Sequence, residues 1–144
     1  TRIEDLLSVE YGEKITPIIL SVLAKDWINY EIDYDIDHIH PKKAAEEIGW
    51  LLTPEEWSYI RKTINKLPNL QYLESSVNNS KKKDKNLLEW FNSYSLNEQE
   101  KIKRQGLFPD DKDVSYDITK YSEFYEARKK IIEKHLRELL VAQQ

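Results

Sequence analysis

Apolar residues recur with helical spacing near both ends of the chain. The pattern predicts helices over residues 3–7 and 15–27, where Pro17 falls in a first turn and is tolerated. A long amphipathic helix is predicted over residues 121–141. The apolar side of this last helix consists of Phe124, Ile131, Ile132, Leu136, Leu139 and Leu140.

The middle of the chain has the pattern of two short strands. Residues 30–37 alternate strictly between apolar and acidic side chains, which is typical of a half-buried strand. A second short strand is predicted over residues 70–73. Between the two, Thr53, Pro54 and Glu56 form a helix start, with an N-cap, a proline at the first position and a capping-box glutamate. This helix should end near Lys66, just before Leu67 and Pro68.

More helices are predicted after the second strand. Ser75 or Ser76 can cap a helix that crosses Asn78 and the lysines after it, and another is predicted over residues 87–94. Ser95 begins a capping box for a further helix that should stop at Gly106, before an acidic loop. The elements predict an α+β fold that is predominantly α-helical, with one small β element at its centre.

Composition limits the kind of protein this can be. With 144 residues, 40% hydrophobic and 33% charged, the chain has the size and make-up of a single globular domain. We expect a cytoplasmic protein, because the sequence shows neither a membrane-spanning stretch nor a basic N-terminal leader. The absence of cysteine excludes a disulfide scaffold and a thiolate zinc site. Because the chain opens on Thr1 and contains no methionine, we expect it to be part of a longer multidomain protein.

Charge is distributed unevenly along the chain. Residues 1–40 carry nine acidic and three basic side chains, whereas residues 41–85 carry nine basic and six acidic ones. Clustered lysines can contact phosphate, with modest and salt-sensitive affinity, although such a cluster is also common on a solvated helix face. The candidate nucleic-acid contacts are Lys42, Lys43, Lys81 and Lys82.

The end of the first predicted strand has an acid beside a histidine. His38 can deprotonate a water near neutral pH, and Asp37 supplies a hard carboxylate oxygen. The amide oxygen of Asn78 is a compatible second ligand, and an all-oxygen site of this kind favours Mg²⁺ or Mn²⁺ over zinc. These groups suit the hydrolysis of a phosphodiester, in which a divalent ion acts as a Lewis acid.

A single site can use both Asp37 and His38 only if the strand ends or twists sharply at this pair. Neighbouring residues of a strand point to opposite faces of the sheet, and Pro41 is well placed to stop the strand. Asn69, just before the second strand, can hold the loop next to His38 through side-chain-to-backbone hydrogen bonds.

The ordered combination of these residues resembles a known family. The motif Asp37-His38-Ile39-His40-Pro41 is followed by Asn69-Leu70-Gln71-Tyr72-Leu73 and, nine residues after Asn69, by Asn78. This pattern resembles the HNH nucleases with a ββα-metal core, and more narrowly the C-terminal HNH domain of GmrSD-type restriction endonucleases. The likeness of the core covers residues 30–85. The wider likeness, which includes the closing helix among the helices of residues 86–144, covers nearly the whole chain.

The resemblance implies a function and a set of roles. His38 would be the general base, Asp37 and Asn78 would hold one Mg²⁺ or Mn²⁺, Asn69 would brace the loop, and Lys81 would contact phosphate. It further implies a DNA-nicking module of a bacterial restriction or phage-defence protein, preceded by a ParB-like nucleotide-hydrolysing domain. In this chain the interval between the two motifs is longer than in compact HNH enzymes and contains a helix as an insertion.

Some residues can serve either the site or the fold. Asp35 lies one pleat from Asp37 and is either an auxiliary metal ligand or part of an exposed acidic face. His40 is either an auxiliary contact to DNA or the metal shell, or a hydrogen-bonded structural histidine.

Two other functions fit the same residues: a catalytically silent module that binds DNA or a partner domain, and a ribonuclease, since nothing in the motif reads the 2′-hydroxyl. The tryptophans expected to anchor the core are Trp27, Trp50, Trp57 and Trp90.

Overall fold

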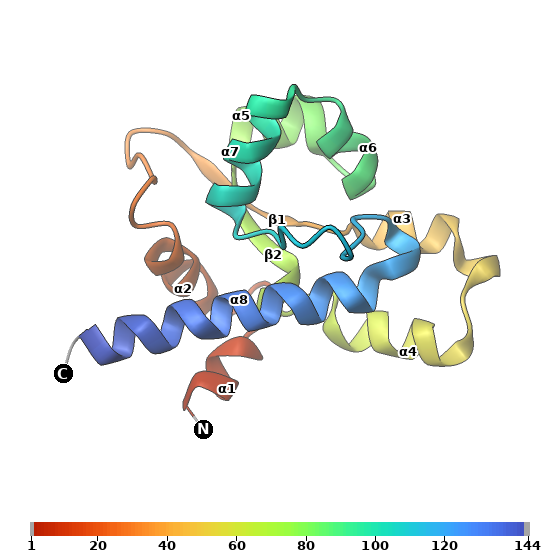
Figure 1. Cartoon of the computed structure of the whole chain (residues 1–144), viewed down its shortest axis with the longest axis horizontal. Helices are drawn as coiled ribbons and strands as arrows, with labels where there is room; N and C mark the ends of the chain where they lie inside the picture. The colour runs from red at the N-terminus through yellow and green to blue at the C-terminus, as the bar shows by residue number, and fades with distance from the viewer. Residues whose placement is uncertain (1, 143–144) are drawn as a thin grey trace.

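A two-stranded antiparallel sheet lies at the centre of the molecule, with helices around it (Figure 1). The computed structural model describes residues 2–142, so that Thr1 lies outside the described residues. Strand β1 (Tyr34–His38) pairs with β2 (Leu70–Glu74), with Tyr34 opposite Glu74 and His38 opposite Leu70. The fold is α+β and predominantly helical, as predicted.

The helices follow one another along the chain with short connections. In chain order they are α1 (Arg2–Leu7), α2 (Ile15–Leu23), α3 (Lys42–Glu47), α4 (Pro54–Thr63), α5 (Ser75–Val77), α6 (Leu87–Asn92), α7 (Leu96–Gly106) and α8 (Tyr121–Ala142). Shorter helical turns lie between them: η1 (Gly49–Leu51), η2 (Leu67–Asn69), η3 (Asn78–Lys82) and η4 (Ile118–Lys120). Among the helices of residues 2–142, none combines the length and the apolar character that crossing a bilayer requires.

Both predicted capping boxes are present. Thr53 Oγ1 accepts a hydrogen bond from the Glu56 N–H at 3.1 Å, while the Glu56 carboxylate accepts one from the Thr53 N–H at 2.9 Å. Ser95 and Glu98 make the same reciprocal pair at the start of α7. An N-cap of this kind stabilises a helix by about 1 kcal/mol, and these two fix where α4 and α7 begin.

Helix α8 runs along the molecule and fixes the start of β2 (Figure 1). Its buried Arg128 donates from the guanidinium to the carbonyls of Leu67 and Pro68, at 3.2 and 3.0 Å, and to that of Gly106 at 3.1 Å. Burial lowers the pKa of Arg128 to about 9. Because Leu67 and Pro68 lead directly into β2, these bonds hold the hairpin against α8. The apolar core residues of α8 are Tyr121, Phe124, Tyr125, Ile132 and Leu136.

The structure departs from the sequence predictions in several elements. Residues 30–33, predicted as the start of the first strand, lie outside it because β2 ends at Glu74; beyond that residue one backbone bond, from the Ser75 N–H to the Asp33 carbonyl at 2.9 Å, continues the pairing. Helix α3 was not predicted, and the helix predicted over residues 15–27 ends at Leu23. Neither serine caps α5, because its N-cap is Glu74. Trp50 is 82% exposed, so its assignment to the core is wrong, whereas Trp90 is buried as predicted.

Candidate active site

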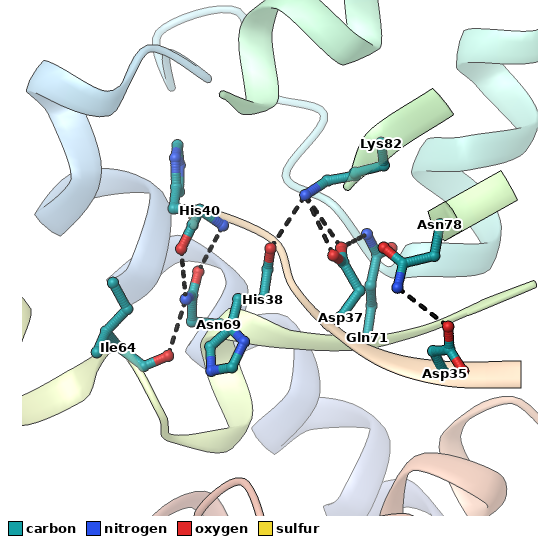
Figure 2. Close-up of polar contacts among 9 residues, drawn as sticks. All are labelled: Asp35, Asp37, His38, His40, Ile64, Asn69, Gln71, Asn78 and Lys82. Carbon is teal, nitrogen blue, oxygen red and sulfur yellow. Dashed lines mark hydrogen bonds and ion pairs between the residues drawn. The ribbon is translucent and has the colours of Figure 1, made fainter. Parts of the chain in front are cut away.

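The antiparallel strand pair and the helical segment after β2 border a cleft of about 590 Å³ that is lined mainly by polar residues. Strand β2 ends opposite the start of β1, and the helical segment after it, α5 and the π-helical turn η3, runs back along β1, so that Lys82 reaches Asp37 and the His38 carbonyl (Figure 2). This arrangement brings Asp37, His38 and Asn78 into the lining of one cleft. The other polar residues of the lining are Lys42, Lys43, Asn65, Asn79, Lys83 and Asp84.

Both Asp37 and His38 reach this cleft, although they are neighbours on β1. Strand β1 ends at His38, and Pro41 serves as the N-cap of α3 three residues later. The Asp37 carboxylate points to Lys82 and Gln71, whereas the His38 ring lies on the other side of the strand (Figure 2). The predicted strand end at this pair is therefore confirmed.

Asn69 is buried and holds the loop that follows His38. Its Oδ1 accepts a hydrogen bond from the His40 N–H at 3.0 Å, and its Nδ2 donates to the carbonyls of His40 and Ile64 at 3.0 and 2.9 Å (Figure 2). The Asn69 carbonyl also accepts from the Ile39 N–H at 2.8 Å. The predicted bracing bonds are confirmed by this geometry, which supports a positioning role for Asn69, because its side chain bonds to backbone atoms of His40 and Ile64.

Asp37 is buried and paired with Lys82. The Lys82 Nζ lies 3.1 Å from one carboxylate oxygen and 3.3 Å from the other, and it donates to the His38 carbonyl at 3.0 Å. Gln71 Nε2 donates a further bond to Asp37 at 2.9 Å. The Lys82 ammonium also lies 5.6 Å from the centre of the Trp90 ring, within cation–π range. The predicted nucleic-acid contact by Lys82 is therefore wrong, because its side chain is fully buried.

Burial acts on both members of this pair. It raises the pKa of Asp37, against the opposing effects of Lys82 and Gln71, and it lowers the pKa of Lys82, against the opposing effect of Asp37. In both groups loss of solvation is the largest cause, so each charge depends on the other for its stability. Removing either partner would leave a buried charge without compensation.

Asn78 has one amide atom bonded and one free. Its Nδ2 donates to the carboxylate of Asp35 at 3.1 Å, and Ser75 donates to the same carboxylate at 2.9 Å (Figure 2). Its Oδ1 is buried and has no hydrogen-bond partner among the described residues. A buried carbonyl oxygen without a hydrogen-bond donor is rare in proteins. Such an oxygen is available to bind a cation. Asp35 holds Asn78 in place through these contacts, rather than standing on an exposed acidic face.

His40 does not reach the cleft, so its assignment as an auxiliary contact is wrong. Its side chain is fully buried and packs edge-on against Phe124 and Tyr121, with ring centres 4.9 and 5.5 Å apart. The alternative of a structural histidine is confirmed by this burial, although neither ring nitrogen has the expected hydrogen-bond partner within residues 2–142. Burial lowers the pKa of His40 to about 3, which keeps the ring neutral.

The cationic rim of the cleft differs in part from the prediction. Lys42 and Lys43 line it as predicted, and Lys43 also pairs with Asp84 at 3.3 Å on the surface. Lys81 is exposed but lies outside the lining, with its ammonium 5.6 Å from the centre of the Tyr94 ring. Lys83 lines the cleft instead of Lys81, because the backbone turns sharply at Lys83, with a φ of 47°.

Asp37 and Asn78 carry oxygen donors of the types that hard cations prefer. The unpaired Oδ1 of Asn78 and the carboxylate of Asp37 are the donor types that Mg²⁺ and Mn²⁺ prefer. Residues 2–142 contain no cluster of three or more His, Cys, Asp or Glu side chains that could hold a metal, so water and phosphate oxygens would have to complete the shell. Lys82 opposes such an ion, because its ammonium already neutralises Asp37.

Three residues of the site were not predicted to belong to it. Asn65 bonds to His38, Gln71 bonds to Asp37, and Asn79 lines the cleft. Gln71 could have been found, since it faces Asp37 in an antiparallel pair that the two predicted strands imply. Asn65 belongs to the inserted segment, whose position no local pattern fixes.

In comparisons with known proteins, no family model and no curated protein matches this chain.

Proposed function

We propose that this chain is a metal-dependent endonuclease module that nicks DNA. The observation that supports this best is that Asp37, His38 and Asn78 line one lysine-rimmed cleft, beside an antiparallel strand pair followed by a helical segment, and that Asn78 has an unpaired Oδ1. Two antiparallel strands followed by a helical segment are what a ββα-metal core would need, which supports the proposal. The proposal is supported by the residue types of the lining, which include a histidine, carboxylate and amide side chains, and lysines.

Each group has a distinct task in the hydrolysis of a phosphodiester. His38 accepts the proton of the attacking water. Lys42, Lys43 and Lys83 attract the phosphates on either side of the bond that breaks. Asp37 and Asn78 would hold one Mg²⁺ or Mn²⁺, which when bound supplies charge neutralisation at the phosphoryl oxygens and the leaving group. Asn69 keeps the loop beside His38 in position.

DNA is the proposed substrate class, and a nick is the elementary event because one site cuts one strand. The experiment that tests this is incubation of supercoiled plasmid with Mg²⁺ or Mn²⁺, with EDTA and the His38→Ala variant as controls. The proposal expects metal-dependent nicked circles that both controls abolish. Structured RNA, run in parallel, tests the ribonuclease alternative, which would cut the RNA in preference to the plasmid. Equal conversion by His38→Ala would contradict the role of His38.

A catalytically silent module that binds DNA or a partner domain is the second candidate. The observation that favours it is the ion pair of Asp37 with Lys82, which stabilises the cleft without a metal. The two candidates differ in their response to metal. A nuclease site should bind Mn²⁺ and gain thermal stability in an Asp37-dependent manner, whereas a silent module should not.

The biological setting is also a proposal, supported by the resemblance to GmrSD-type proteins. It is a bacterial restriction or phage-defence protein in which a ParB-like domain selects the DNA and this module cuts it.

A further inference from the structure

We propose that Asn65 and Tyr11 form a holder that fixes the ring orientation and the tautomer of His38. Naming His38 as the base rests on the proposed function, whereas the holder itself rests on contacts in the structure. Both residues are positioning residues, since they act on the reaction through His38.

The first contact is a hydrogen bond between two side chains 27 residues apart in sequence. The Nε2 of His38 lies 2.8 Å from the Oδ1 of Asn65. An amide oxygen carries no proton, so Nε2 must be the protonated nitrogen of the neutral ring. The lone pair of the ring then lies on Nδ1, which is the nitrogen left free to take a proton from water. Asn65 thus selects which nitrogen acts as base.

The second contact limits the rotation of the ring. The ring centre of Tyr11 lies 4.8 Å from that of His38, with the two planes tilted by 39°. A ring held at its edge by a hydrogen bond and on its side by an aromatic ring has little freedom about its side-chain torsions. Within residues 2–142, the bond to His38 is the one hydrogen bond that the Asn65 side chain makes.

The two holder residues are joined to each other through the backbone. The Tyr11 N–H donates to the Asn65 carbonyl at 2.7 Å, and the Leu67 N–H donates to the Val9 carbonyl at 2.9 Å. An antiparallel bridge between Glu10 and Lys66 lies between these two bonds. The segment between α1 and α2 is therefore joined by backbone bonds to the segment after α4. This assigns a role to the insertion between the two sequence motifs: it delivers Asn65 to the base.

Both side chains can be replaced without opening the core, because Asn65 is exposed and Tyr11 is 52% exposed. Their position is therefore not explained by core packing. The matched variants are Asn65→Ala, which removes the acceptor, and Asn65→Asp, which keeps one. At Tyr11, Tyr11→Ala removes the ring and Tyr11→Phe keeps it.

The test is the tautomer of His38, measured by long-range ¹H–¹⁵N correlation NMR on the full chain without metal in mildly alkaline buffer. The chain has three histidines, so His40→Leu and His135→Gln variants assign the signals. We expect His38 to be protonated at Nε2 in the wild type, Asn65→Asp and Tyr11→Phe, and to become a tautomer mixture in Asn65→Ala. Tyr11→Ala should broaden its signals. Protonation at Nδ1 in the wild type, or an unchanged tautomer in Asn65→Ala, would overturn the proposal.

Cleavage kinetics provide the second readout. Asn65→Ala should lower kcat by about tenfold or more with little change in KM, as is typical when the partner that orients a functional group is removed. Asn65→Asp should restore most of the loss. Because the NMR measurement needs no substrate, an inactive wild type with the expected tautomers would reject the proposed nuclease while leaving the holder in place. If the wild type is active and Asn65→Ala has the same kcat, the proposed holder is rejected and the proposed nuclease is not.

Discussion

The ammonium of Lys82 lies 3.1 Å from the carboxylate of Asp37, with both side chains buried beneath the cleft. The pair joins the last turn of η3 to the end of β1, so it connects the helical and strand parts of the site. It also means that a residue predicted to bind a metal already has a cationic partner. Any divalent ion at Asp37 must share the carboxylate with this ammonium.

Replacing Lys82 by Met should destabilise the fold. A buried carboxylate left without its partner costs about 3–5 kcal/mol of unfolding free energy. Urea denaturation of Lys82→Met measures this loss, and Lys83→Met, on the exposed neighbour, is the control. Adding Asp37→Asn to Lys82→Met should recover more than half of the loss, since no charge is then buried alone. A loss below about 1 kcal/mol in Lys82→Met would contradict the pairing.

Removing the Asn69 side chain should also lower stability, although Asn69 carries no charge. Asn69→Ala leaves the His40 N–H and the His40 and Ile64 carbonyls without their partner in a buried region. Each buried polar group left unsatisfied costs about 1–3 kcal/mol, so a total loss above about 2 kcal/mol is expected. Asn79→Ala, at an exposed position of the same cleft, should stay within about 0.5 kcal/mol of the wild type.

Stability should fall on acidification because of His40. Its pKa is lowered from 6.5 to about 3 in the folded chain, so the unfolded chain binds a proton between these two values while the folded chain does not. The contribution is therefore fully present above pH 6.5 and is lost as the pH falls toward 3, at up to about 1.4 kcal/mol per pH unit.

Comparison with variants separates the contribution of His40 to the pH dependence of stability from that of the other titratable groups. His40→Leu should lose this part of the pH dependence in urea denaturation series at several pH values. His135→Gln, at an exposed histidine, should keep it. Parallel curves for the wild type and His40→Leu across this pH range would show that His40 is not the group responsible.

The two neighbouring asparagines of the cleft should differ in metal binding. Asn78→Ala removes the unpaired buried oxygen, whereas Asn79→Ala removes an exposed amide. At a Mn²⁺ concentration about ten times Kd, binding should add about 1.4 kcal/mol to the stability of the wild type and of Asn79→Ala. The gain should vanish in Asn78→Ala, as measured by thermal unfolding with and without Mn²⁺. An equal gain in both variants would place the ion elsewhere.

Local patterns predicted most of the elements correctly. The capping boxes at Thr53 and Ser95 define helix starts through contacts within one turn, and β2 follows from a short apolar run after Pro68. The first strand was predicted too long because alternation alone does not tell where the partner strand ends. Its true start is set by Glu74, the last residue of β2.

The candidate site was predicted less completely, because its electrostatics depend on contacts between distant segments. Asp37, His38 and Asn78 line one cleft, although the Asp37 carboxylate and the His38 ring lie on opposite sides of β1. The inward direction of Lys82 depends on the π-helical turn, which no local pattern in the lysine run signals. The burial of His40 depends on the packing of α8 across the hairpin, with Phe124 against its ring.

The central claim is that Asp37 and Asn78 together hold one divalent ion next to His38. Anomalous diffraction from crystals of the chain soaked in Mn²⁺ tests it most directly, with Asn78→Ala crystals as the control. The predicted result is one anomalous peak at about 2.0–2.2 Å from both a carboxylate oxygen of Asp37 and the Oδ1 of Asn78, absent from the Asn78→Ala crystals. A cleft without a peak at saturating Mn²⁺, with Lys82 still bonded to both oxygens of Asp37, would contradict the claim.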